Sequence, residues 1–193
     1  MKIILVVTLA AFWRSRNYDI GMLLFLLAIA TFSGCLHGKA KPENQLVPDD
    51  FRIPEEGIAE RIIFRPLRVE DAEEDYEAVM ESRVRLRALF GGNWPADDFT
   101  LEQNRADLKA HQEAAEERLA FTYKIVSRQG GGILGCLYIY PSEDVDAEIL
   151  FWVRDSAFDE GMQKEVLATI KQWVTQDWPF NKVSYIGDRM KEG

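Results

Sequence analysis

The residues of this chain with the clearest chemical potential lie near its C-terminus, in an expected strand, polar loop and helix. Ile149–Val153 is an aromatic and β-branched run, which predicts a strand. A polar loop then ends in Gly161, and apolar residues recur at helical spacing from Met162 to Val174. Backbone N–H groups at the start of a helix that follows a strand can bind a phosphate. This order of elements therefore fits a phosphate-binding turn, and it also fits an ordinary strand–helix connection that binds nothing.

The same segment is similar to a known motif. Ala147-Glu148-Ile149, Trp152-Val153 and Gly161, eight residues further on, resemble the coenzyme A motif of the GNAT-type N-acetyltransferases. The resemblance is closest to the branch of ribosomal-protein N-terminal acetyltransferases. Arg61–Ala72 resembles the first strand of that family and the polar beginning of its first helix. The likeness covers roughly Phe51–Asp188.

This resemblance implies the fold class. We expect an α/β protein, an α+β mixed sheet of the GNAT-like acyl-CoA N-acyltransferase fold. The sequence ends at Gly193, before the helix and two strands that close the family's fold, so the fold is expected to be C-terminally short. In the family, the pantetheine arm of acetyl-CoA lies in a gap between two parallel strands, which correspond here to 148–153 and 183–186.

The resemblance also implies the substrates and their site. Acetyl-CoA would be the donor, and a small-molecule or peptide amine would be the acceptor. An alkylamine has a pKa of about 10.4, so a base must remove a proton before it attacks a thioester. The family has a carboxylate at the position of Glu148, which is our candidate for this base; Glu148 could instead be a structural or surface residue.

The backbone of the strand and loop would bind the donor. By the resemblance, the N–H groups of Phe151 and Val153 orient the pantetheine and polarise the thioester carbonyl, as an oxyanion site does. The positions expected to bind the cofactor are Phe151, Trp152, Val153, Phe158, Asp159, Glu160, Gly161, Met162 and Gln163.

Several of these positions depart from the family pattern. Phe158 stands where Arg or Gln is usual and cannot donate a hydrogen bond, and Gln163 replaces a small residue. Asp159 and Glu160 place negative charge where a pyrophosphate would bind, although acids also suit the first turn of any helix. We therefore expect weak coenzyme A binding, with a dissociation constant no tighter than about 100 μM.

Composition narrows the classes of partner. The 193 residues carry a net charge of −9, which argues against nucleic-acid binding because phosphate backbones require clustered Lys and Arg. Arg83, Arg85 and Arg87 alternate, and we interpret them as a solvated helix face. The pairs His37/His111 and Cys35/Cys136 lack metal-ligand spacing, so no metal site is expected.

The N-terminal 35 residues predict a signal peptide, a lipoprotein signal or a membrane anchor. The apolar run Ile20–Phe32 is short for a membrane span, which needs about 20 residues, and suits a secretory core region. Ser33-Gly34 before Cys35 resembles a bacterial lipoprotein cleavage site, with Cys35 as the lipidated residue of a membrane-anchored protein. The alternatives are an uncleaved anchor, or a mis-assigned start of a cytoplasmic protein. Residues 36–60 are interpreted as a tether and 61–193 as the GNAT-like domain.

The order of elements in the domain follows from the patterns. We expect a strand at 61–67 and one helix from Glu70 to about Phe90, with Val84 among its buried residues. Thr100 and Gln103 form a capping box for a helix that continues to about residue 118. A hairpin (119–127 and 132–140) and a strand–helix–strand unit (146–186) complete the domain, and a right-handed crossover makes the last two strands parallel.

Export and acetyl transfer conflict, because acetyl-CoA is a cytosolic metabolite. The first hypothesis is an N-acetyltransferase-like enzyme. The second is an exported, membrane-tethered GNAT-like domain without catalytic activity, which acts as a binding or envelope module.

The first testable prediction concerns Cys35. If Cys35 is lipidated, Cys35→Ser leaves a full-length precursor without fatty acid, because the thiol that forms the thioether is missing. Metabolic labelling with a radioactive fatty acid and gel mobility measure this directly. An unlabelled wild type whose mobility equals that of the variant contradicts it.

Overall fold

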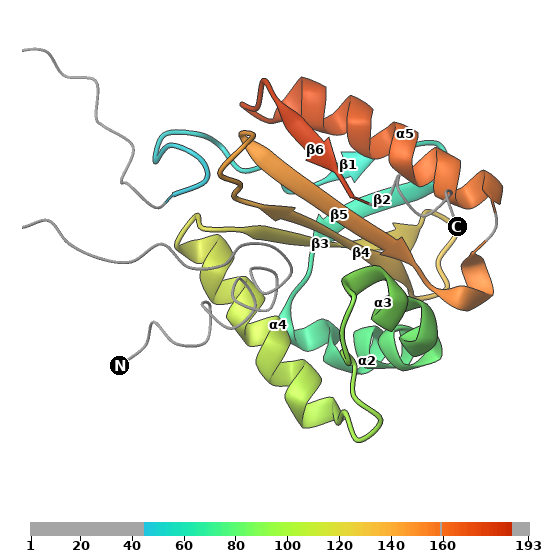
Figure 1. Ribbon diagram of the computed structural model, residues 1–193. Helices are drawn as coiled ribbons and strands as arrows, with labels where there is room; N and C mark the ends of the chain where they lie inside the picture. The colour runs from blue at the N-terminus through green and yellow to red at the C-terminus, as the bar shows by residue number, and fades with distance from the viewer. Residues whose placement is uncertain (1–44, 159, 187–193) are drawn as a thin grey trace, which may run out of the picture. The chain divides into compact units, whose positions relative to one another are not determined.

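The computed structural model describes residues 45–158 and 160–186. The predicted signal segment, Cys35, Asp159 and the side chain of Glu160 lie outside the described residues. Within the described ranges the strands form one six-stranded sheet, with helices on both faces (Figure 1). The strands are β1 (Gly57–Ile58), β2 (Ile62–Pro66), β3 (Phe121–Ser127), β4 (Ile133–Tyr140), β5 (Ala147–Val153) and β6 (Val183–Tyr185). The helices are α2 (Ala72–Glu81), α3 (Arg83–Phe90), α4 (Leu101–Glu116) and α5 (Glu160–Asp177), with short 3-10 turns at Val69–Asp71 and Asp155–Ala157.

The sheet is mixed, and its order in space follows the order in sequence. Neighbours from β1 to β5 are antiparallel. β5 and β6 are parallel, with Ala147 opposite Val183 and Ile149 opposite Tyr185, because α5 carries the chain back along the sheet before β6 begins. The prediction of a parallel final pair is confirmed.

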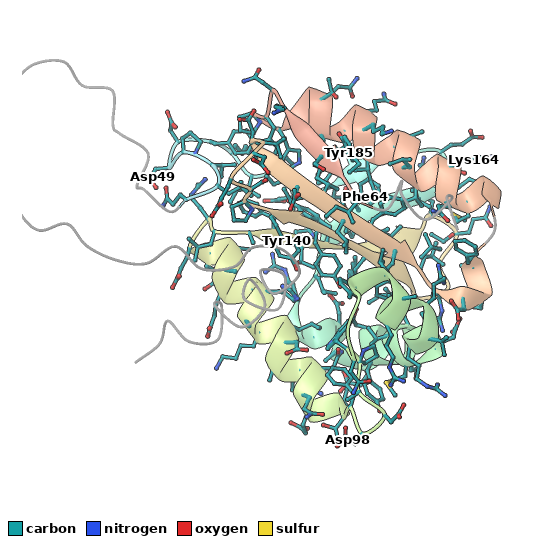
Figure 2. The ribbon with its side chains drawn as sticks, in the orientation of Figure 1. Asp49, Phe64, Asp98, Tyr140, Lys164 and Tyr185 are labelled. Carbon is teal, nitrogen blue, oxygen red and sulfur yellow. The ribbon has the colours of Figure 1, made fainter. Side chains whose placement is uncertain are left out.

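Two hydrophobic cores lie on opposite faces of the sheet. α5 covers one face, and α2, α3 and α4 cover the other (Figure 1). Because side chains alternate along a strand, β5 contributes to both cores, with Phe151 facing α5 and Trp152 facing the other helices. Figure 2 shows Phe64 on the α5 side of the sheet and Tyr140 on the α4 side.

The helix predicted from Glu70 to Phe90 is two helices. Ser82 interrupts it with φ −95° and ψ 7°, and this fully buried hydroxyl accepts a hydrogen bond from the N–H of Asp155 at 3.1 Å. Val84, two residues beyond the break, is 71% exposed, so its predicted burial is wrong. Leu86 is buried as expected.

The chain before residue 61 is part of the domain where the structure describes it. Leu46 and Val47 are buried in the α5-side core, and the Leu46 N–H donates to the Arg118 carbonyl at 2.7 Å. A Cβ on Gly57 would lie 2.7 Å from a Phe64 ring carbon and 2.8 Å from a Trp173 ring carbon, so glycine is needed for this strand to pack. The prediction of a tether up to residue 60 is therefore wrong for residues 45–60.

The local patterns in the middle of the chain are confirmed. α4 begins after Thr100, whose hydroxyl accepts the Gln103 N–H at 3.2 Å while the Gln103 amide oxygen accepts the Thr100 N–H at 2.8 Å. The expected hairpin is β3–β4, joined through the glycines that follow Gln129.

The burial of the N-terminal segment gives a stability prediction. Leu46→Ala removes buried apolar contacts, and we expect the free energy of unfolding to fall by about 2–3 kcal/mol. The matched control is Ile58→Ala, because Ile58 is 62% exposed and its truncation should change the value by less than about 0.5 kcal/mol. Urea unfolding of both variants provides the measurement. Equal, small effects would show that residues 45–60 do not stabilise the domain.

Candidate active site

The candidate site is built on the edge of β5 that faces β6. The Arg154 N–H donates to the Leu134 carbonyl at 2.6 Å. The backbone N–H and carbonyl groups of the even-numbered β5 residues therefore point towards β4. The Ile149 carbonyl accepts the Ile186 N–H at 2.8 Å, so the backbone groups of the odd-numbered β5 residues point towards β6. By this alternation, the backbone groups of Phe151 and Val153 also point to the β6 side.

Those backbone groups lie beyond the paired part of β6. The last β5–β6 partners in the register are Ile149 and Tyr185, so the described part of β6 runs alongside only the first residues of β5. Within the described residues, Phe151 and Val153 have no β6 partner in the register, and the Val153 carbonyl accepts Arg85 Nη2. Hydrogen bonding of this edge to an extended ligand, the role predicted for these two residues, stays a prediction.

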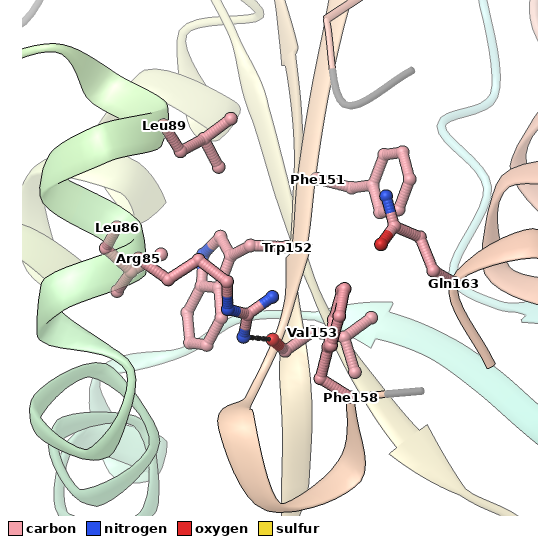
Figure 3. Close-up of a pocket in the computed structure, with 8 residues that line it drawn as sticks. All are labelled: Arg85, Leu86, Leu89, Phe151, Trp152, Val153, Phe158 and Gln163. Atoms are coloured by element: carbon pink, nitrogen blue, oxygen red, sulfur yellow. Dashed lines mark hydrogen bonds between the residues drawn. The ribbon is translucent and has the colours of Figure 1, made fainter. Parts of the chain in front are cut away.

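A narrow groove follows this edge between α3 and α5 (Figure 3). Its cavity is about 10 Å³, which is room for about one water molecule. The residues that line it are Arg85, Leu86, Leu89, Phe151, Trp152, Val153, Phe158 and Gln163. The predicted positions Phe151, Trp152, Val153, Phe158 and Gln163 thus come together. Phe158 is 40% exposed, so its ring can leave the groove more easily than the buried strand residues can.

The junction between α2 and α3 holds the loop that follows β5. Glu81 accepts hydrogen bonds from the Ser156 N–H at 2.5 Å and from Arg154 Nε at 2.9 Å, while Ser82 accepts the Asp155 N–H. The Phe158 N–H donates to the Asp155 carbonyl at 3.2 Å. These loop amides are therefore already bonded within the protein, and the candidate phosphate donors are the amides that begin with α5 at Glu160.

Arg85 also reaches this loop, and the sequence interpretation missed it. Its Nε donates to Asp155 Oδ1 at 2.7 Å, its Nη2 donates to the Val153 carbonyl, and its guanidinium lies 4.3 Å from the centre of the Phe158 ring. Only 20% of its side chain is exposed, so the interpretation of the alternating arginines as a solvated face is wrong for Arg85. Local sequence patterns could not reveal this contact, because Val153 is 68 residues away from Arg85 in the chain.

Glu148 lies on the other face of β5 from Phe151. It is opposite Tyr140 in the β4–β5 register and opposite Ser184 in the β5–β6 register, and it is partly buried. Burial raises the pKa of the neighbouring phenols of Tyr138 and Tyr140. Glu148 lies in the part of β5 that is paired with both neighbouring strands, and its role as a base stays a prediction.

Behind Glu148, the α4-side core contains a buried polar network that the sequence did not predict. Asp75 accepts hydrogen bonds from Asn104 Nδ2 at 3.0 Å and from the Cys136 thiol at 3.2 Å. Burial raises the pKa values of Asp75 and of the Cys136 thiol. His111 Nδ1 lies 3.2 Å from Thr122 Oγ1, and burial lowers the pKa of His111 to about 4. These groups are internally bonded, so we assign them a structural role.

No group of His, Cys, Asp and Glu side chains able to hold a metal ion occurs in the described part of the chain. Among residues 45–158 and 160–186, no helix combines the length and the apolar composition needed to cross a membrane.

The comparisons with known proteins agree with this geometry. Residues 61–188 match the family model described as "Acetyltransferase (GNAT) domain". The chain therefore belongs to the GNAT acetyltransferase family and carries the domain of a GNAT-type N-acetyltransferase. A search of curated protein sequences finds no match.

Solved structures show the same fold at low sequence identity. One is a Vibrio cholerae protein provisionally assigned as a ribosomal-protein-serine acetyltransferase, with 17% identity, a TM-score of 0.56 and coverage of 67% of this chain and 72% of that one. The second is RimL, a ribosomal L7/L12 α-N-protein acetyltransferase in complex with coenzyme A, with 17% identity, a TM-score of 0.53 and coverage of 62% and 67%. The third is the microcin C7 self-immunity acetyltransferase MccE with acetyl-CoA and AMP, with 16% identity, a TM-score of 0.52 and coverage of 63% and 67%. These likenesses confirm the expected GNAT fold.

The bonds of Glu81 give a pH-dependent prediction. The Arg154 guanidinium lowers the pKa of Glu81 from 4.5 to about 2 in the folded state. Because the folded pKa lies below the unfolded one, Glu81 stabilises the fold above pH 4.5, and this contribution disappears as the pH falls towards 2. We expect Glu81→Gln to lower the free energy of unfolding by about 1–2 kcal/mol at pH 7, with a smaller difference from wild type at pH 3.

Denaturant unfolding at the two pH values measures this difference. The matched control is Asp97→Asn, because Asp97 pairs with Arg87 and is 87% exposed. It should leave the unfolding midpoint nearly unchanged at both pH values. A penalty for Glu81→Gln of the same size at pH 3 and pH 7 would rule out the ionic origin.

Proposed function

We propose that this protein transfers the acetyl group of acetyl-CoA to the amine of a small molecule or peptide. The observation that carries the proposal is the parallel β5–β6 pair, whose partners among residues up to 186 end with Ile149 and Tyr185, while Phe151 and Val153 line a groove. Membership of the GNAT family supports it, and two of the similar structures hold coenzyme A or acetyl-CoA.

In this proposal the edge of β5 binds the donor, and Glu148 acts as the base. The Phe151 and Val153 backbone groups hold the extended pantetheine arm and polarise the thioester carbonyl. Glu148 accepts a proton from the acceptor amine, whose nitrogen then forms a bond to the acetyl carbon. The carbon–sulfur bond breaks, coenzyme A leaves as the thiolate, and the thiolate takes up the second proton that the nitrogen loses as the amide forms.

The charge of the chain favours a cationic acceptor. A net charge of −9 raises the local concentration of positively charged amines near the protein. One similar structure, from Salmonella typhimurium, is described as modifying the N-terminal serine of the ribosomal protein L7/L12. A peptide α-amine and a polyamine are therefore the acceptor classes to test first.

The fit of the donor is limited by the groove itself. A cavity of about 10 Å³ admits a pantetheine arm only after a side chain such as Phe158 moves. Asp155 adds a negative charge beside the groove, and its side chain is 44% exposed. Both features favour weak binding of coenzyme A.

These same features favour the second candidate, a GNAT-like domain without catalytic activity. That candidate goes together with the proposed lipidation of Cys35, which would place the domain at a membrane, outside the cytosol. A cytoplasmic location would instead give the domain access to acetyl-CoA.

Thiol release decides between the two candidates. Purified protein, acetyl-CoA and a panel of amines should release the coenzyme A thiol. Glu148→Gln should lower kcat by at least about a hundredfold with an unchanged KM for acetyl-CoA, because the amine keeps its proton. Glu102→Gln, an exposed residue in the first turn of α4, is the matched control and should keep full activity. No thiol release with any amine, together with no binding of coenzyme A, would favour the non-catalytic module.

A further inference from the structure

The groove beside β5 contains one charged side chain among the eight residues that line it. That residue is Arg85, which extends from α3 to the end of β5, and Figure 3 shows its guanidinium between Trp152 and Phe158. The other lining side chains are apolar, apart from the amide of Gln163. Any anion that binds at this end of the groove therefore meets Arg85.

The guanidinium is held in place and keeps hydrogen-bonding capacity. Nε donates to Asp155 Oδ1, and Nη2 donates to the Val153 carbonyl and lies 2.6 Å from the same Asp155 oxygen. No partner for Nη1 occurs among the residues that the structure describes. The Phe158 ring covers the face of the guanidinium at 4.3 Å and is partly exposed. Movement of this ring would uncover a positive group that is already oriented.

The rest of the loop offers little to a diphosphate. Ser82 and Glu81 already accept the amides of Asp155 and Ser156, and Phe158 cannot donate. The nearby cation Arg154 is bonded to Glu81 and to the Ile133 carbonyl. A guanidinium, by contrast, matches phosphate oxygens in both charge and geometry.

We propose that Arg85 binds the diphosphate of coenzyme A and supplies from α3 the positive charge that residue 158 lacks. This inference rests on the proposed function, because it assigns a binding residue for the same donor. Arg85 is a substrate-binding residue in this scheme, and Val153 and Asp155 orient it.

The test measures the affinity of the full chain for three ligands by calorimetry. Coenzyme A and dephospho-coenzyme A both contain the diphosphate, whereas pantetheine has the same arm without it. The variants are Arg85→Gln, Arg85→Lys and the matched control Arg83→Gln, because Arg83 lies on the same helix, is exposed and bonds only to the Met80 carbonyl among the contacts described.

Arg85→Gln should weaken the binding of coenzyme A and dephospho-coenzyme A at least about tenfold, because a charge-assisted phosphate contact is lost. Pantetheine should bind as it does to wild type. Arg85→Lys should retain part of the affinity, Arg83→Gln should retain all of it, and Phe158→Arg in the Arg85→Gln background should restore it.

Three outcomes overturn the proposal. Unchanged coenzyme A affinity in Arg85→Gln shows that Arg85 does not bind the diphosphate, and tighter binding shows that it obstructs the groove. An equal loss for coenzyme A and pantetheine shows a purely structural role. In each case thiol release by the wild type still tests the proposed function separately, and a wild type that neither binds coenzyme A nor releases thiol overturns both.

Discussion

The interaction on which the site depends is the set of hydrogen bonds from the α2–α3 junction to the loop after β5. Glu81 accepts the Ser156 amide, Ser82 accepts the Asp155 amide, and Arg85 bonds to both Val153 and Asp155. The three side chains lie one and four residues apart, which places them on one side of the junction, facing the loop. The junction therefore fixes where β5 ends and how the chain approaches α5.

These contacts also set the chemistry of the loop. The amides of Asp155 and Ser156, which bond to Ser82 and Glu81, are no longer available to an anion. The bond to the Glu81 carboxylate is stronger than one to a neutral acceptor. The loop gains a defined conformation and loses phosphate donors. An anionic ligand must then be bound by the start of α5 and by side chains from other elements.

The two structural carboxyls respond to pH in opposite directions. Arg154 lowers the pKa of Glu81, so its contribution to stability is lost as the pH falls. Burial raises the pKa of Asp75, so the folded state favours the protonated form and loses stability as the pH rises through that raised value. The first carboxyl holds the surface loop and the second joins α2 and α4 to β4, so falling pH and rising pH act on different parts of the domain.

The sequence predicts what depends on near neighbours along the chain. The capping box at Thr100, the hairpin and the parallel final strands follow from spacing, turn residues and crossover geometry. The break at Ser82 could not be predicted, because it depends on an amide 73 residues away. Leu46 and Val47 form a short apolar pair in a largely polar, proline-containing segment, so periodicity gives no sign of their burial.

The difference between local patterns and long-range contacts also explains why the motif of the site could be predicted and the role of Arg85 could not. The motif around Glu148 and Val153 is local and can be read from the sequence, whereas the role of a charged residue on a helix depends on which loop the helix faces. If Arg85 binds the donor as proposed, donor binding is joined to the helix junction, because Asp155 is bonded to both Ser82 and Arg85. A guanidinium held by Val153 and Asp155 needs little reorganisation on binding. The neighbouring Asp155 carboxylate offsets part of its attraction for an anion, so a well-oriented arginine and weak donor affinity are compatible in one site.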